Sequence, residues 1–355
     1  MPLHLRTVQE LVTAPHRPLN APAPHFFPAR VTYVAAFSYL CGAMDNGACI
    51  RQDTTARTDG TRVSPAALTR TDGTTTPQRR GMAFLRVLCV CLLVGVAGVS
   101  RAAHGQLAAV RGAVPGGYDF WLYAPPAYVE SHERTPLIIF LHGASLCGTN
   151  MQKVRRYGPI DAINRGRAIP ALVVAPQNPG GSWQPKRICA VLDYVESTYN
   201  VDTARVYVIG MSLGGYGTLD FVGTYPDRIA AAMALCGGCT LSDLSGIGRV
   251  PLWIMHGTAD RDVTVSHSKA IVTAIRAAGG GALLRYDWLK GASHGYPARL
   301  FYLTKTYDWL LSHSLDDTPR TVNRDITFTK AELKNAYADL EPEETRYDVV
   351  DKIAP

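Results

Sequence analysis

A serine in a glycine-flanked turn is the residue of this sequence whose setting most directly suggests chemistry. Ser212 stands between Gly210 and Gly214, directly after the apolar run 206–209, and a helix-like segment follows it. A serine between a strand and a helix is typical of a nucleophile elbow, in which a sharp turn exposes the hydroxyl. Side chains at Gly210 or Gly214 would collide with neighbouring chain in such a turn. In the alternative interpretation, Ser212 only caps a helix.

An acid and a histidine follow at the ends of two further predicted strands. The apolar run 252–255 leads to Asp260, and the strand-like segment 283–288 leads to His294. The chain order serine, acid, histidine is that of the α/β-hydrolases. The intervals of 48 and 34 residues each leave room for a strand and a helix.

Together these residues predict a catalytic triad. Ser212 would be the nucleophile, His294 the general base and acid, and Asp260 the residue that orients the imidazole. Taken singly, Asp260 also fits a helix cap and His294 a surface loop. Asp262, two residues further on, is the alternative acid.

The loop after an earlier apolar run completes the predicted machinery. The run 136–141 is followed by His142, Gly143, Ala144 and Ser145. In α/β-hydrolases this loop supplies one backbone N–H of the oxyanion hole, and the residue after the nucleophile supplies the other. We therefore predict Ala144, with Ser145 as the alternative, and Leu213. For His142 we predict a bracing role within the loop.

These segments carry a family resemblance. The set LHGAS, GMSLGGYG, HGTAD and SHG resembles the α/β-hydrolase esterases of the dienelactone-hydrolase and prolyl-oligopeptidase-like group. That group includes feruloyl and acetylxylan esterases and polyester depolymerases. The resemblance covers roughly residues 117–312 and implies the fold and the triad more than the substrate. The alternation of strands and helices likewise predicts an α/β class, with a mostly parallel, doubly wound sheet and helices on both faces.

The chain divides into four predicted parts. Residues 1–81 are rich in Pro, Thr, Arg and Ala with a repeated Arg-Thr-Asp-Gly, so we expect a low-complexity, disordered leader. Residues 82–105 suit a signal peptide, which makes Met82 the expected biological start. Residues 106–312 suit one catalytic domain. The charged tail 313–355 is expected to pack on the surface or to stay mobile, with a short helix from a capping box at Thr329 to Leu340.

The signal-peptide prediction implies a secreted or periplasmic protein without stable membrane association after cleavage. Its apolar core, 87–99, is short for a membrane span and is preceded by arginines. Small residues allow cleavage before Ala103 or before Gln106. A single-pass anchor is the alternative.

Charge and cysteine content exclude several classes of function. The net charge of +7 is not accompanied by a nucleic-acid-binding motif, so we expect no nucleic-acid partner. Cys236 and Cys239 form a lone C-x-x-C pair, and no second pair completes a zinc site. We expect buried thiols or a disulfide that joins two of Cys147, Cys189, Cys236 and Cys239, with the pairing left open, and no metal or organic cofactor.

The sequence thus predicts a secreted serine esterase whose partner is a small-molecule or polysaccharide-linked ester, with feruloyl and acetyl esters of carbohydrate ranked first. Trp183, in the loop after the strand-like run 171–176, is predicted to line the substrate pocket, although it also suits loop packing. The alternatives are a serine peptidase of the prolyl-oligopeptidase-like type and a non-catalytic carbohydrate-binding module on the same fold.

Overall fold

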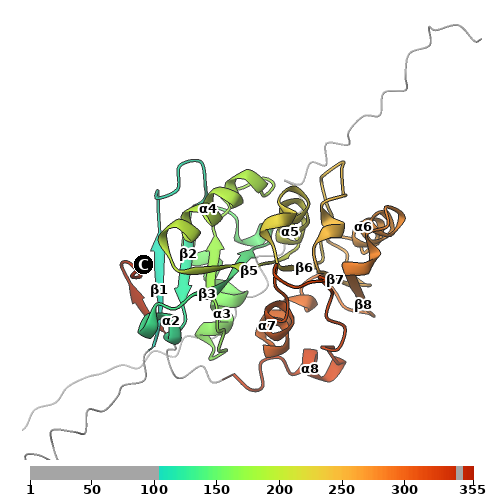
Figure 1. Cartoon of the computed structure of the whole chain (residues 1–355). Helices are drawn as coiled ribbons and strands as arrows, with labels where there is room; N and C mark the ends of the chain where they lie inside the picture. Colours follow the sequence, from blue (N-terminus) through green and yellow to red (C-terminus); the bar gives the residue numbers. More distant parts are fainter. Residues whose placement is uncertain (1–103, 341–346) are drawn as a thin grey trace, which may run out of the picture. The chain divides into compact units, whose positions relative to one another are not determined.

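The computed structural model describes residues 104–340 and 347–355 (Figure 1). The predictions for the leader 1–81 and for most of the signal segment 82–105 lie outside these residues. Within them, no helix is long and apolar enough to cross a membrane.

A nine-stranded sheet forms the centre of the described region, in the order β8-β7-β6-β5-β3-β4-β2-β1-β9. From β4 through β3 to β8 all neighbouring strands are parallel, whereas β2 runs antiparallel to both β1 and β4. This order and these directions confirm the predicted α/β-hydrolase fold with its mostly parallel sheet. The strands are β1 (Gly105–Val110), β2 (Phe120–Ala124), β3 (Thr135–Leu141), β4 (Leu172–Pro176), β5 (Val201–Met211), β6 (Ala231–Leu235), β7 (Leu252–Gly257), β8 (Leu284–Leu289) and β9 (Tyr347–Val350).

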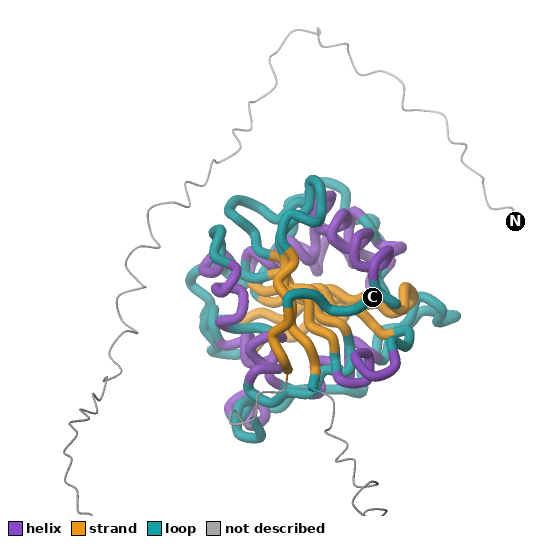
Figure 2. The backbone as a smooth tube through the Cα atoms, turned by 90° about the vertical axis from the view of Figure 1, so that its left-hand side faces the viewer, coloured by secondary structure: helices purple, strands orange, loops and turns teal. Residues whose placement is uncertain are grey.

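Helices cover both faces of the sheet, as the sequence predicts (Figures 1 and 2). One face packs against α4, α5 and α6, and the other packs against α3, α7 and α8. The helices are α2 (Pro126–Ser131), α3 (Pro159–Asn164), α4 (Pro185–Thr198), α5 (Leu213–Thr224), α6 (Ser266–Ala277), α7 (Thr304–Leu311) and α8 (Lys330–Lys334).

The central strands are apolar along their whole length because both of their faces are covered. In β3, Ile139 belongs to one core cluster, while Ile138 and Phe140 belong to the cluster on the opposite face. Every residue of β3 is buried. Such strands fix their register strongly, because a slip of one residue would exchange the two side-chain sets.

The C-terminal tail is more integral than the sequence suggested, and the predicted domain end at residue 312 is corrected. Strand β9 pairs with β1, with Tyr347 opposite Gly105, and extends the sheet. The Tyr347 and Ile353 side chains are buried. The capping box at Thr329 is present, but its helix α8 ends at Lys334. Charged residues dominate the composition of the tail and conceal the few apolar side chains that anchor it.

Candidate active site

Ser212 occupies the turn between β5 and α5, in a backbone conformation with φ of 58° and ψ of −121°. This left-handed conformation is costly for a residue with a side chain and is characteristic of functional turns. A Cβ at Gly210 would lie 2.3 Å from the Gly214 carbonyl oxygen, and one at Gly214 would lie 1.8 Å from the Leu141 carbonyl oxygen. The collisions predicted from the sequence are confirmed. Gly210 lets the end of β5 approach the start of α5, and Gly214 lets the start of α5 pack directly against the end of β3.

The two predicted oxyanion donors lie at helix starts beside this turn. Leu213 is the first residue of α5, and Ala144 is the first residue of the short 3-10 helix Ala144–Leu146 after β3. The first N–H groups of a helix have no acceptor within it, and they lie at its positive end. A Cβ at Gly143 would lie 3.3 Å from the Ser212 Cβ, so the β3 loop adjoins the nucleophile. The positions of Ala144 and Leu213 therefore suit the role predicted for them.

The buried His142 and the half-buried Tyr157 fix the backbone of this loop. His142 Nε2 accepts the Asn178 N–H at 3.0 Å, so the ring hydrogen is on Nδ1, which donates to the Gly143 carbonyl at 2.8 Å. Burial lowers the pKa of His142 to about 4, which keeps the ring neutral. The Tyr157 hydroxyl accepts the Gly143 N–H at 2.6 Å. The bracing role predicted for His142 is confirmed, whereas no sequence motif pointed to Tyr157.

Trp183 is a core residue, and its predicted place in the substrate pocket is corrected. Its side chain is only 2% exposed. The indole N–H donates to the His142 carbonyl at 3.1 Å, and the ring packs edge-on against His142 and Tyr118. A Cβ at Gly217 of α5 would lie 2.7 Å from the indole. Trp183 therefore packs against the loop after β3 that carries Ala144, which is the packing alternative raised by the sequence.

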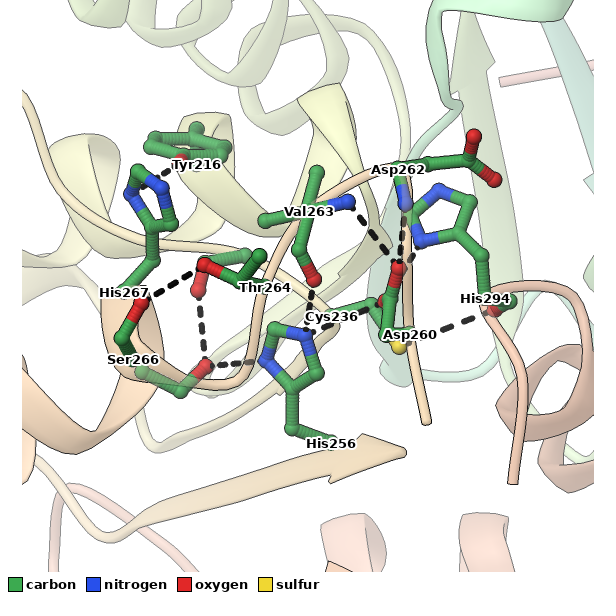
Figure 3. Close-up of polar contacts among 12 residues, drawn as sticks. Tyr216, Cys236, His256, Asp260, Asp262, Val263, Thr264, Ser266, His267 and His294 are labelled. Carbon is green, nitrogen blue, oxygen red and sulfur yellow. Dashed lines mark hydrogen bonds and ion pairs between the residues drawn. The ribbon is translucent and has the colours of Figure 1, made fainter. Parts of the chain in front are cut away.

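Asp260 and His294 form a close pair beyond the ends of β7 and β8 (Figure 3). Asp260 Oδ2 lies 2.7 Å from His294 Nδ1, and the Asp260 side chain is fully buried. Asp260 Oδ1 accepts the backbone N–H groups of Asp262 and Val263 at 3.0 and 2.9 Å. Burial raises the pKa of Asp260, but the hydrogen bonds from His294 and from these N–H groups outweigh it, and the net pKa is lowered. The carboxylate is therefore ionised and pointed at the imidazole.

Asp262, the alternative acid, does not contact His294. It gives Asp260 its backbone N–H, while its own carboxylate is exposed and points away in Figure 3. The structure thus brings Asp260, rather than Asp262, to the histidine.

A second imidazole, which sequence reasoning did not single out, contacts the same carboxylate. His256 lies in β7 and is fully buried. Its Nε2 lies 3.1 Å from Asp260 Oδ2 and 2.8 Å from the Val263 carbonyl oxygen. Both neighbours are acceptors, so Nε2 must carry a hydrogen. Burial lowers the pKa of His256 and favours the neutral ring. The spacing of four residues within HGTAD was the available signal.

Ser268 of α6 anchors the far side of this ring. His256 Nδ1 lies 2.7 Å from Ser268 Oγ, which lies 2.7 Å from the Gly237 carbonyl oxygen. In the neutral ring Nδ1 is an acceptor, so the single hydroxyl hydrogen serves Nδ1 or the Gly237 carbonyl. Four elements of the chain thereby converge on Asp260, because the network runs from Gly237 through Ser268 and His256 to the carboxylate and then to His294.

Cys236 lies beside the acid–histidine pair. It follows β6 with a φ of 50°, its Sγ is 3.7 Å from the His294 carbonyl oxygen, and its side chain is buried. One ligand atom each of Cys236, Asp260 and His294 lies within 4.8 Å of the others. However, burial raises the pKa of the thiol well above its ordinary value, and Asp260 is already paired with His294. Cys147, Cys189, Cys236 and Cys239 are all free; Cys189 and Cys236 are buried, and Cys147 and Cys239 are half-buried.

The strand order and the serine turn between β5 and α5 define an α/β-hydrolase fold, and the pair of Asp260 and His294 follows β7 and β8. Residues 175–303, which include all three of these side chains, match the Dienelactone hydrolase family.

Curated relatives match part of the chain. The chain is 30% identical over 153 residues to a bifunctional acetylxylan esterase/xylanase of Neocallimastix patriciarum, a match that spans 41% of this chain and 22% of that protein. It is 32% identical over 138 residues to acylamino-acid-releasing enzyme 2 of Oryza sativa subsp. japonica, spanning 35% and 17%. The chain thus covers about a fifth of the length of these two relatives.

Solved structures with similar chains include a thermostable esterase, 28% identical with a TM-score of 0.48, for which 55% of this chain and 59% of that chain are covered. A feruloyl esterase module from Clostridium thermocellum is 18% identical with a TM-score of 0.47, and 59% and 88% of the two chains are covered.

Proposed function

We propose that the protein is a serine esterase that cleaves carboxylic esters through an acyl-enzyme. The observation that carries this proposal is the pairing of the buried Asp260 carboxylate with the half-buried His294, at the same sheet edge as the strained Ser212 turn. The match to the dienelactone hydrolase family supports it.

The proposed mechanism assigns one task to each group. Ser212 Oγ attacks the ester carbonyl carbon while His294 Nε2 takes its proton. The Leu213 and Ala144 N–H groups stabilise the oxyanion, and the alkoxide leaves with the proton returned by His294. Water then repeats the sequence on the acyl-enzyme. Asp260 remains ionised throughout and stabilises the imidazolium.

For the substrate we propose carbohydrate-linked esters, such as feruloyl or acetyl groups on a polysaccharide, ahead of small free carboxylesters. Support comes from the acetylxylan esterase among the relatives rather than from Trp183, which is buried. A peptidase is the second candidate, because the acylamino-acid-releasing enzyme is also a relative and the same triad chemistry cleaves amides.

A substrate panel tests both levels of this proposal. The full chain should hydrolyse p-nitrophenyl acetate, and among natural-type substrates it should prefer acetylated xylan or methyl ferulate to a long-chain acyl ester and to a prolyl peptide amide. Absence of any ester hydrolysis in correctly folded protein would remove the esterase. Faster cleavage of the amide would replace it by the peptidase.

Secretion through residues 82–105 is also proposed. Cleavage before Ala103 leaves β1 complete, whereas cleavage before Gln106 removes Gly105, the β1 residue that pairs with Tyr347 of β9. We therefore favour the earlier site. Mass spectrometry of exported protein expressed from Met82 should show a new N-terminus at Ala103. An intact start at residue 82 on exported protein would indicate an anchor.

A further inference from the structure

A groove with aromatic and cationic walls lies between α6 and the edge strand β8, and Ser212, Asp260 and His294 are not among the residues that line it. It has a volume of about 380 Å³ and is lined by Lys269, Val272, Thr273, Arg276, Tyr286 and Trp288. The four α6 residues are spaced so that they share one helix face. Tyr286 and Trp288 are two apart in β8 and share one face of the sheet.

The aromatic wall is partly open to solvent. The Tyr286 and Trp288 ring centroids are 5.3 Å apart at an interplanar angle of 36°, and the Tyr286 side chain is 36% exposed. The intervening Asp287 belongs to the other face, where it accepts the Trp253 indole N–H. Exposed aromatic side chains that lie next to one another are unusual on a soluble protein unless they contact a ligand or a partner.

The cationic wall has no acidic counterpart in the described parts of the chain. Lys269 Nζ lies 5.9 Å from the Trp288 ring centroid, and Arg276 donates to the Tyr286 hydroxyl at 3.3 Å. Neither cation forms an ion pair with a described carboxylate. Helix α6 itself contains no Asp or Glu. The groove therefore presents two uncompensated positive charges beside two aromatic faces.

We propose that this groove is an accessory binding site for an acidic sugar chain, in which uronate carboxylates alternate with or branch from neutral sugar rings. The apolar face of a pyranose ring packs on an aromatic side chain. A uronate carboxylate on that chain pairs with Arg276 or Lys269. The site would hold the polysaccharide while its ester groups reach Ser212. The proposal rests on the proposed function only for this last step.

Binding is tested without turnover by isothermal titration calorimetry of the full chain with alkali-deacetylated glucuronoxylan. The matched ligand is the same polysaccharide with its carboxyl groups reduced to alcohols. We expect at least tenfold tighter binding of the acidic form, and this preference should shrink as salt is raised. Equal affinity for the two forms would overturn the proposal, as would equally tight binding of poly-glutamate, which would indicate an acidic peptide instead.

Variants locate the site. The double variant Lys269→Gln/Arg276→Gln should bind the acidic polysaccharide about tenfold more weakly. Lys290→Gln, which removes an exposed cation outside the groove, should not change binding. Tyr286→Ala should weaken binding of both forms. Unchanged binding in the double variant would show that the groove is not the site.

Activity on p-nitrophenyl acetate separates this proposal from the proposed function. The double variant should hydrolyse this small ester at the wild-type rate, because it contacts none of the catalytic groups. A chain that binds the acidic polysaccharide but hydrolyses no ester would overturn the esterase and keep the binding site. A chain with normal hydrolysis and no preference for the acidic form would do the reverse.

Discussion

The same dipeptide, His-Gly, ends two strands of the sheet, and the two histidines do different things. His142 follows β3 and His256 lies at the end of β7, and both are fully buried with a lowered pKa. Among the described residues, the His142 ring forms hydrogen bonds to backbone groups, namely the Gly143 carbonyl and the Asn178 N–H. His256 instead contacts the Asp260 carboxylate and the Ser268 hydroxyl. The first shapes the oxyanion loop, and the second holds the acid of the triad.

The difference shows that the partner, rather than the histidine or its burial, sets the role. A neutral imidazole that is hydrogen-bonded to peptide groups only fixes the position of the backbone. A neutral imidazole against an ionised carboxylate also shares that carboxylate with His294, and so it affects how strongly Asp260 stabilises the imidazolium. We call the surroundings of His142 the β3 corner and the surroundings of His256 the β7 corner. Mutations at these two corners should therefore change different measurable properties.

The largest effect should come from the residues that both corners serve. Ser212→Ala and His294→Ala should each lower kcat on p-nitrophenyl acetate by at least about a thousandfold, because each removes a group that reacts. Circular dichroism should show both variants folded. A near wild-type rate in Ser212→Ala would refute the mechanism, and loss of activity in Asp262→Asn but not in Asp260→Asn would shift the acid to Asp262.

The β3 corner should control stability at acidic pH. The pKa of His142 is about 4 in the folded protein, against an ordinary value of 6.5, so between these values the unfolded chain binds a proton that the native chain does not. Stability should therefore fall as pH drops from 6.5 to 4, by about 3 kcal/mol from this residue.

Urea unfolding at pH 7, 5.5 and 4.5 checks this. His142→Gln preserves an acceptor for the Asn178 N–H and cannot titrate, so it should be less stable at pH 7 but less sensitive to acid. The same acid sensitivity in this variant and in the wild type would contradict a titrating His142.

How much of this site could be predicted from the sequence differs between its parts. The Gly210–Ser212–Gly214 turn was predictable, because the steric demands of one sharp turn fall on residues that are close together in the sequence. Asp260 and His294 were predictable from their chain order at strand ends. Tyr157 was not, because its contact with Gly143 depends on how the segment after the β3 loop folds back over the sheet.

Two errors have the same origin. The aromatic type of Trp183 and its loop suggested a pocket wall, but the depth of the loop depends on the approach of α5 at Gly217. The charged tail suggested an appendage, yet β9 completes the sheet beside β1. Packing between segments far apart in the chain decides both cases, and composition does not encode it.

The β7 corner should control activity. His256→Leu removes the second hydrogen bond to Asp260 Oδ2 and so leaves the carboxylate free to move out of line with His294. We expect kcat to fall about thirtyfold, or about 2 kcal/mol in the barrier, because a displaced carboxylate no longer orients and stabilises the imidazole. Because the displaced carboxylate stabilises the protonated His294 less, the acidic limb of the kcat/KM profile should move to lower pH. The groups that face the Asp260 carboxylate are the Cys236 thiol, the Asp262 N–H, the His256 ring and the His294 ring.

His256→Gln is the matched variant, because its amide retains a donor. It should recover most of the activity and return the acidic limb toward the wild-type position. Equal losses in the Leu and Gln variants, with an unmoved limb in both, would mean that His256 only fills space.

The smallest effect should come from the outer end of the same network. Ser268→Ala removes the hydroxyl next to His256 Nδ1 and leaves the ring free to turn, while the His256–Asp260 contact itself remains. We expect kcat to fall about fivefold, corresponding to about 1 kcal/mol for one neutral hydrogen bond. Ser266→Ala, in the same helix but with a hydroxyl bonded to Thr264, is the control and should be silent. If a double-mutant cycle showed Ser268→Ala and His256→Leu to be fully additive, the hydroxyl would act independently of the imidazole, and the network would end at His256.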